Sequence, residues 1–169
     1  MATAFADRAR GRLGLAVVAV TALLTGCSAP AASTPGGPVA VPMQILNTMT
    51  LVTVQVNDSS YHALFLLDTG ANLTVLTPLY AGRLGIVVPE NARRRTIRAV
   101  GGTAHSIPLV KVARLAVGEA VVESMDVGVY EAFPQSRTID GILGADFLNR
   151  FNLTFDRTHG RLLLHPIGR

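Results

Sequence analysis

Short segments in which apolar residues occupy every second position recur through this chain from Thr50 onward. Successive side chains of a β-strand point to opposite faces, so this alternation predicts strands that each bury one face. Turn-forming residues separate these segments at intervals of about ten residues. Many short strands at such spacing predict an all-β, barrel-like fold, and the chain lacks the strand–helix alternation of a nucleotide-binding sheet.

The pattern predicts individual strands and the turns between them. Turn residues such as Asn, Asp, Ser and Gly mark where each hairpin reverses. The expected hairpins are 50–56 with 61–67 around the turn 57–60, 95–100 with 106–117 around 101–103, and 152–155 with 161–165 around 158–160; a further strand covers 121–130.

One short helix is predicted after the second strand, and another near the Gly-rich segment 140–146. For the first helix, Thr77 suits the N-cap, Pro78 the first helical position, and Gly85 the position just beyond the end. The second helix is expected near Phe147–Arg150.

The N-terminal residues have the composition of a targeting segment. A basic stretch ending at Arg12 precedes the apolar run 13–24, and the run leads into Leu24-Thr25-Gly26-Cys27. A run of 12 residues is too short to span a bilayer and fits a secretory signal. The LTGC sequence resembles the lipobox of bacterial lipoproteins. That resemblance implies that 1–26 is a signal peptide and that Cys27 carries acyl chains such as palmitate; an ordinary signal peptide with a chance cysteine is the alternative.

Residues 27–42 are almost all small residues, Pro and Gly, and are expected to form a flexible linker after the lipidated cysteine. The folded domain is expected over 43–169. We therefore expect an extracytoplasmic protein held at a bacterial membrane by lipid on Cys27. Ser28 after the cysteine resembles proteins sent to the outer membrane, which would place the domain on its periplasmic side in a cell with two membranes.

The composition limits the possible partners. The formal charge is +4, but without 1–26 the chain has 12 Lys+Arg against 10 Asp+Glu, so we expect no nucleic-acid partner. The one cysteine excludes an internal disulfide and a thiolate metal cluster. Because the four histidines are scattered without ligand spacing, neither a metal nor another cofactor is expected.

Two motifs define the candidate site. Phe65-Leu66-Leu67 runs into Asp68-Thr69-Gly70, and Ile142-Leu143-Gly144 occurs later; Gly101-Gly102 lies between them at a predicted hairpin tip. Asp, Thr and Gly are common in turns, so the triplet alone does not define a function. In this order and spacing, however, the parts resemble the retropepsin-like aspartic proteases, particularly the single-domain bacterial members.

The resemblance implies a retropepsin-like closed β-barrel with one or two short helices that functions as a two-fold dimer. It implies catalytic roles for Asp68, Thr69 and Gly70, with the Thr69 hydroxyl cross-linking the two active-site loops. Substrate would contact Ala71, Asn72 and the flap residues Gly101, Gly102 and Thr103.

The expected chemistry needs two carboxylates that share a proton, one acting as base toward water and the other as acid toward the carbonyl. The chain has one D-T-G motif. Asp140 and Asp146 are the remaining candidates within the chain, but their contexts indicate a turn acid and a helix-start acid. The resemblance implies instead a dyad with one Asp68 from each of two subunits.

The sequence thus predicts a membrane-anchored aspartic endopeptidase. Ala71 cannot donate a hydrogen bond to the aspartate as a serine could, so we expect a working pH nearer neutral than that of digestive aspartic proteases. One alternative is a catalytically silent lipoprotein of the same fold that binds a peptide or envelope protein. Another is a structural lipoprotein whose triplet is an ordinary turn.

Overall fold

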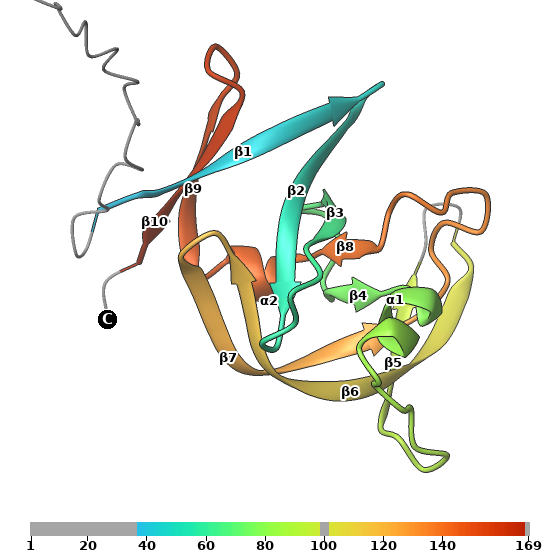
Figure 1. Cartoon of the computed structure of the whole chain (residues 1–169). Helices are drawn as coiled ribbons and strands as arrows, with labels where there is room; N and C mark the ends of the chain where they lie inside the picture. Colours follow the sequence, from blue (N-terminus) through green and yellow to red (C-terminus); the bar gives the residue numbers. More distant parts are fainter. Residues whose placement is uncertain (1–36, 99–101, 168–169) are drawn as a thin grey trace, which may run out of the picture. The chain divides into compact units, whose positions relative to one another are not determined.

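The computed structural model describes residues 37–98 and 102–167, all of them within one unit of the chain, Ser33–Arg169. This unit is built mainly from strands (Figure 1). The strands are β1 (Val39–Leu46), β2 (Met49–Val56), β3 (Ala63–Leu67), β4 (Val75–Leu76), β5 (Arg94–Arg98), β6 (Ala104–Val117), β7 (Ala120–Val129), β8 (Gly141–Leu143), β9 (Phe151–Asp156) and β10 (Arg161–Pro166); the helices are α1 (Pro78–Arg83) and α2 (Ala145–Leu148).

The strands form one sheet in the order β5-β6-β7-β4-β8-β3-β2-β1-β10-β9, and β6 also pairs with β2. This additional pairing aligns Gln55 with Ala116 and Val56 with Leu115, and it closes the segment from β6 to β2 into a barrel. Closure removes the free edges of these strands. The predicted closed β-barrel with one or two short helices is therefore confirmed, and the described residues form two helices.

β1 connects the barrel to the β9–β10 hairpin. Its first half, Val39–Pro42, pairs with β10, and its second half, Met43–Leu46, pairs with β2 (Figure 1). Proline has no N–H to donate, and Pro42 lies where the strand changes partners. The predicted linker 27–42 is thus too long at its end, because Val39–Pro42 belong to a strand; residues 27–36 and the signal segment 1–26 lie outside the described residues.

The predicted hairpins and α1 are confirmed, apart from the tip residues 99–101, which lie outside the described part. The Thr77 side chain accepts a hydrogen bond from the backbone N–H of Tyr80, and Pro78 begins the helix. Gly85 follows the C-cap with φ +67°, a conformation that favours glycine. The capping residues therefore determine both ends of α1.

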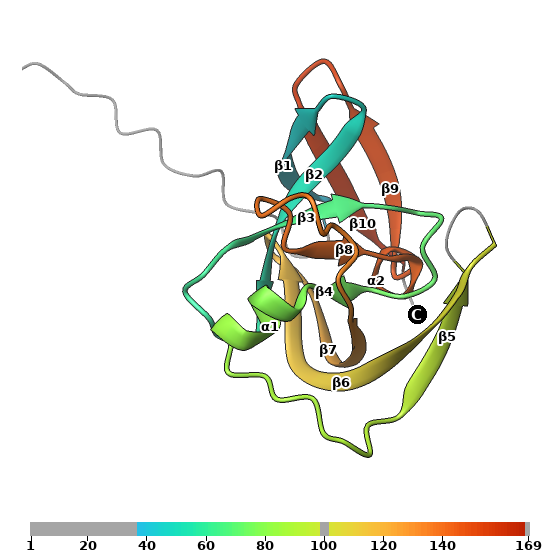
Figure 2. The same ribbon diagram turned by 90° about the vertical axis from the view of Figure 1, so that its right-hand side faces the viewer.

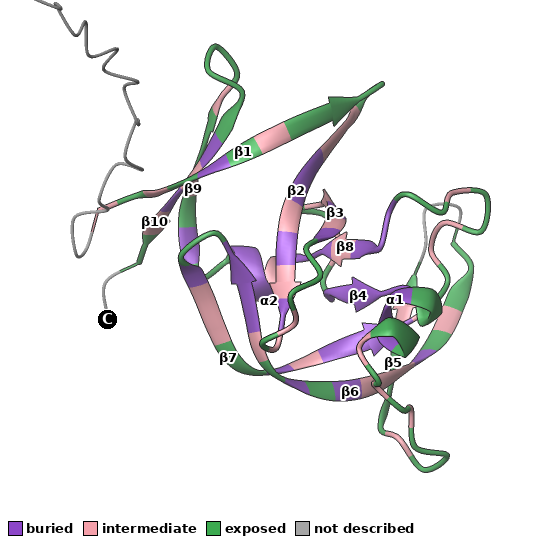
Figure 3. Ribbon diagram, in the orientation of Figure 1, coloured by how far each residue is buried: buried purple, intermediate pink, exposed green. Residues whose placement is uncertain are grey.

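The main core fills the barrel. Residues that are buried occur on β2, β4, β6, β7 and β8 (Figure 3). Along β2, Val52, Val54 and Val56 are fully buried while the residues between them are half-buried, so the period of two predicted from the sequence corresponds to the buried face.

Tyr80 of α1 lies in this core with its hydroxyl buried. The backbone of Val56 comes close to the hydroxyl, which has no hydrogen-bond partner of normal geometry among the described residues. Burial, together with the negative charge of Asp140, raises the Tyr80 pKa to about 12.

We expect Tyr80→Phe to leave the free energy of unfolding unchanged or to raise it by up to about 1 kcal/mol at pH 7, because an unpaired buried hydroxyl is lost. In the native protein the pKa of Tyr80 is higher in the folded state than in the unfolded state. Stability is thus complete below about pH 10 and falls toward pH 12, and the variant should lack this decline. Urea unfolding at pH 7 and pH 11 measures both effects. A loss of more than about 1 kcal/mol at pH 7 would show that the hydroxyl is paired.

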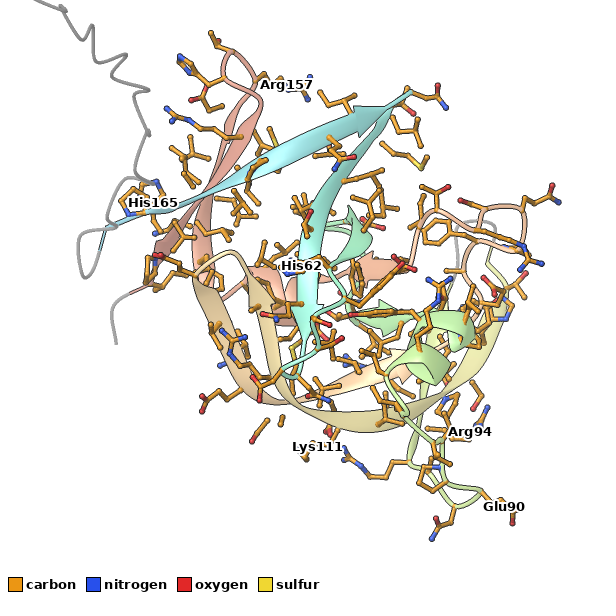
Figure 4. All side chains as sticks on the ribbon, viewed as in Figure 1. His62, Glu90, Arg94, Lys111, Arg157 and His165 are labelled. Atoms are coloured by element: carbon orange, nitrogen blue, oxygen red, sulfur yellow. The ribbon has the colours of Figure 1, made fainter. Side chains whose placement is uncertain are left out.

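The described histidines lie on different elements. His62 precedes β3 and His165 lies on β10 (Figure 4), His105 lies on β6, and His159 pairs with Asp156. Within residues 37–98 and 102–167, no three His, Cys, Asp or Glu side chains gather where they could hold a metal ion. The same part of the chain contains no helix long and apolar enough to cross a membrane.

Candidate active site

The D-T-G triplet lies on the loop that joins β3 to β4, which we call the Asp68 loop (residues 68–74). β8 lies between these two strands, parallel to β3 and antiparallel to β4 (Figure 2). The Asp68 loop therefore passes around the end of β8. The backbone N–H of Asp68 donates to the carbonyl of Leu143, 3.1 Å away, which extends the β3–β8 pairing into the loop.

Gly70 orients the Asp68 carboxylate. Its N–H donates to Asp68 Oδ1 at 2.8 Å, and the N–H of Ala71 donates to the Asp68 carbonyl at 3.2 Å. A Cβ at position 70 would lie 3.2 Å from the same Oδ1, closer than most contacts of a real Cβ. Glycine thus gives the carboxylate a donor and leaves space beside it.

Gly144 lies directly beneath the Asp68 loop. A Cβ at this position would lie 2.7–2.9 Å from the backbone of Leu73 and Ala71, too close for any side chain. The N–H of Ala145 donates to the Ala71 carbonyl at 2.7 Å. The late Ile142-Leu143-Gly144 motif thus provides the surface on which the loop rests.

Gly141 at the start of β8 has a similar constraint. A Cβ there would come within 2.3 Å of the Val75 carbonyl oxygen and 2.7 Å of the Phe65 ring. The sequence singled out the motif but not this contact, because the residues involved are far apart in the chain.

The other predicted site residues lie near Asp68 or on the β5–β6 hairpin, which the sequence predicted to be a flap and which we call the flap hairpin. Thr69 and Asn72 are exposed and Ala71 is half-buried. Thr69 makes no hydrogen bond to the described residues. Gly102, with φ +87°, and Thr103 are exposed between β5 and β6. The two remaining predictions, Gly101 and Cys27, lie outside the described residues.

A second apolar cluster connects the flap hairpin to the Asp68 loop. Leu73 of the Asp68 loop and Val75 of β4 are buried against Ile107 of β6. Four partly exposed side chains complete this cluster: Ile97, Leu109, Tyr130 and Ile142. The Tyr130 hydroxyl lies 3.3 Å from His105 Nδ1, and this contact joins β6 to the end of β7. Apolar packing therefore joins β5, β6 and the end of β7 to the end of the Asp68 loop.

Neither Asp140 nor Asp146 is available as a second catalytic carboxylate. Asp140 precedes β8 at the end away from Asp68; it is buried, accepts from the N–H of Leu64 at 3.1 Å, and lies 3.7 Å from the Arg83 guanidinium. Asp146 is the second residue of α2 and accepts hydrogen bonds from Thr74. The interpretation of both as structural acids agrees with these positions, although the sequence did not predict their partners.

Two cavities formed by described residues lie away from Asp68. One of about 150 Å³ is bounded by Thr77, Asp140 and the loop before β8, and another of about 300 Å³ lies between Ile45 and Phe155. Neither is lined by residues of the Asp68 loop.

Comparison with known proteins agrees with this geometry. Residues 52–147, more than half of the chain, match the family described as aspartyl protease, from β2 through the Asp68 loop to α2. The chain therefore belongs to the aspartyl protease family.

Two relatives show how far the similarity extends. DNA damage-inducible protein 1 of Chaetomium globosum is 23% identical over 124 residues, which cover 73% of this chain but only 27% of that protein. The chain thus spans about a quarter of that relative's length. A retropepsin-like aspartic protease from Rickettsia conorii superimposes with a TM-score of 0.56 at 20% identity, covering 76% of this chain and 89% of that chain. This structural likeness shows that the fold is retropepsin-like.

Proposed function

We propose that this protein is an aspartic endopeptidase that works as a homodimer, with Asp68 of each subunit forming the catalytic dyad. The observation that carries the proposal is the Asp68 carboxylate. It lies at the end of a barrel strand, half-buried, and is oriented by the Gly70 N–H at 2.8 Å. Membership of the aspartyl protease family supports the same reaction.

Three features of the described residues support a dimer. Thr69, Gly70 and Asn72 are exposed beside Asp68, and the two other acids near β8 are occupied by internal contacts. In addition, the outer edge of β9, which follows α2, pairs with no other described strand. Exposed edges of this kind readily pair with another chain. A two-fold axis beside Asp68 would bring the second carboxylate into the site.

The dyad would act on a water molecule and the peptide carbonyl. Two carboxyl groups about 3 Å apart cannot both ionise, so the two Asp68 side chains share one proton. The ionised carboxylate takes a proton from the water molecule as the water oxygen attacks the carbonyl carbon. The protonated carboxyl group of the partner gives its proton to the carbonyl oxygen. The tetrahedral intermediate then collapses, the C–N bond breaks, and the leaving nitrogen receives a proton.

The substrate would be an extended peptide with apolar side chains near the cleaved bond. The partly exposed members of the second apolar cluster, Ile97, Leu109, Tyr130 and Ile142, support this preference. The β5–β6 hairpin could contribute backbone hydrogen bonds to such a peptide, as in strand addition.

We further propose that lipid on Cys27 holds the enzyme at a membrane surface, extracytoplasmically. This part rests on the LTGC sequence after an apolar run. Metabolic labelling with a fatty acid should mark the full chain and should not mark Cys27→Ser. Equal labelling of the two proteins would exclude this anchor.

The site should work best closer to neutral pH than digestive aspartic proteases do. Ala71 provides no side-chain donor to Asp68, so a hydrogen bond that would favour the ionised form is missing. A profile of kcat/KM against pH measures the apparent pKa values of the dyad as a pair. An optimum well below pH 4 would contradict this prediction, and Ala71→Ser should shift the acidic limb to lower pH.

The decisive experiment is a cleavage assay on a peptide library with the native chain and Asp68→Asn, with and without a pepstatin-type inhibitor. Cleavage that is lost in the variant supports the enzyme. Peptide binding without cleavage would instead identify a silent binding protein of the same fold. Cleavage that persists in Asp68→Asn would refute the proposed dyad.

A further inference from the structure

The Asp68 loop is attached to residues 143–146 in three places. Two attachments are backbone hydrogen bonds, from the Asp68 N–H to Leu143 and from the Ala145 N–H to Ala71. Backbone bonds of this kind depend little on which side chains are present. The third attachment involves the side chains of Thr74 and Asp146, and it therefore depends on these two residues.

Thr74 is fully buried and uses both its hydroxyl and its backbone N–H in this attachment. Its hydroxyl donates to Asp146 Oδ1 at 2.6 Å and accepts from the N–H of Gly144 at 3.1 Å. Its backbone N–H donates to both carboxylate oxygens of Asp146, at 3.0 and 2.9 Å. Thr74 thus joins the end of the Asp68 loop to the two residues on either side of Ala145.

The carboxylate of Asp146 matches this set of donors. Besides the two Thr74 groups, its Oδ1 accepts from the N–H of Phe147 at 2.9 Å. An ionised carboxylate only accepts hydrogen bonds, whereas an amide has one accepting oxygen and an NH₂ donor. In an Asp146→Asn variant, the NH₂ would face a donor, either the Thr74 N–H or the Phe147 N–H. Asparagine is therefore a poor replacement despite its equal size.

A structural role limited to capping α2 does not account for these contacts. The N-cap residue of α2 is Gly144, which has no side chain for capping, and the helix covers only four residues. Most of the hydrogen bonds to Asp146 come from Thr74 on the Asp68 loop, which is 72 positions away in the sequence. Asp146 thus acts mainly on the Asp68 loop.

We infer that Asp146 is a positioning residue for the reaction, which acts through Thr74 to hold the Asp68 loop in its reactive conformation. The inference rests on the proposed peptidase function. Asp146 does not touch the reacting atoms. It fixes the C-terminal end of the Asp68 loop, and the N-terminal end of the same loop carries the Asp68 carboxylate. Between the two ends, the backbone of the loop packs closely against Gly144.

The test uses Asp146→Asn, Thr74→Val and Thr74→Ser in the full chain, with Asp58→Asn as a matched control on the exposed β2–β3 turn. A displaced catalytic group can cost about tenfold to a hundredfold in rate. We expect losses of this size in kcat, per folded enzyme, for Asp146→Asn and Thr74→Val, with KM changed less than about threefold. Thr74→Ser, which keeps the hydroxyl, should retain most of the activity, and Asp58→Asn should match the native protein.

Combining Asp146→Asn with Thr74→Val provides a second criterion. If the two residues act through one another, the double variant should lose no more kcat than the stronger single variant. Multiplying losses would overturn the inference. So would an unchanged kcat in the folded fraction of Asp146→Asn, because the residue would then affect stability alone.

Hydrogen exchange of the Thr74 amide separates this inference from the proposed function. Asp146→Asn should speed exchange at Thr74 without comparable change at the barrel strands. If the native chain cleaves no peptide, the proposed function and the catalytic part of this inference both fail. Faster exchange at Thr74 in Asp146→Asn would still show that Asp146 holds the loop. Unchanged exchange at Thr74 would overturn the positioning itself.

Discussion

Asp68→Asn is expected to reduce kcat/KM for peptide cleavage by about a thousandfold or more, since an amide can neither take a proton from water nor share one with a second carboxylate. The fold should persist. Asp68 is half-buried, and an asparagine oxygen can still accept the hydrogen bond from the Gly70 N–H. Steady-state kinetics measure the loss, and urea unfolding verifies the fold. Asp58→Asn, on an exposed turn, is the control for the same chemical change.

Mixing the native chain with Asp68→Asn tests the dyad across subunits. If both proteins exchange freely in equal amounts, about a quarter of the dimers contain two native chains, and only these should be active. An activity near half of the unmixed value would indicate that each chain works alone. Sedimentation of the mixture should show dimers throughout, and a monomer that cleaves peptide would contradict the mechanism.

The second large effect is expected from Gly144→Ala. The added Cβ would meet the backbone of Leu73 and Ala71 at 2.7–2.9 Å, and backbone atoms of a tightly held loop cannot rotate away. We expect a loss of at least about 2 kcal/mol in the free energy of unfolding, with little cleavage in the remaining folded fraction. The backbone of Gly144 has φ −95°, which any residue can adopt, so the lack of space is the cause.

Gly82→Ala is the matched control for this substitution. Gly82 lies in α1, and nothing lies within 4 Å of a Cβ built there. Alanine favours the helix over glycine, so stability should rise by up to about 1 kcal/mol. Urea unfolding midpoints compare the two variants. Equal midpoints for Gly144→Ala and the native protein would mean that the Asp68 loop can move away from α2.

The sequence predicted those parts of the fold that depend on local patterns. Alternation identified most of the long strands, since each buries one face over several residues, and the capping residues placed α1 correctly. The sequence did not predict β1, the first half of which was assigned to the linker. β4 and β8 were missed because two or three residues are too short to show a period. Their pairing with β3 and β7 defines them, and that depends on residues distant in the chain.

The candidate site was predictable to a similar extent. The D-T-G triplet identified the candidate loop from local sequence, and within that loop Gly70 contacts its near neighbour Asp68. The roles of Gly141 and Asp146 could not be predicted in this way. One depends on contact with Val75 and Phe65, and the other on hydrogen bonds from Thr74. From the sequence alone, the glycine at position 141 suits an ordinary turn and the acid at position 146 suits a helix start equally well.

The order in which the chain is synthesised determines when the Asp68 site can form. The hydrogen bonds from Thr74 to Asp146 join residues 72 positions apart, and Asp68 itself depends on Leu143. Contacts this distant form late in folding, because the intervening chain must first be ordered. A partly synthesised chain that ends before β8 therefore carries the triplet but cannot build the site. Proteolytic capacity would thus arise only after nearly the whole domain has been synthesised.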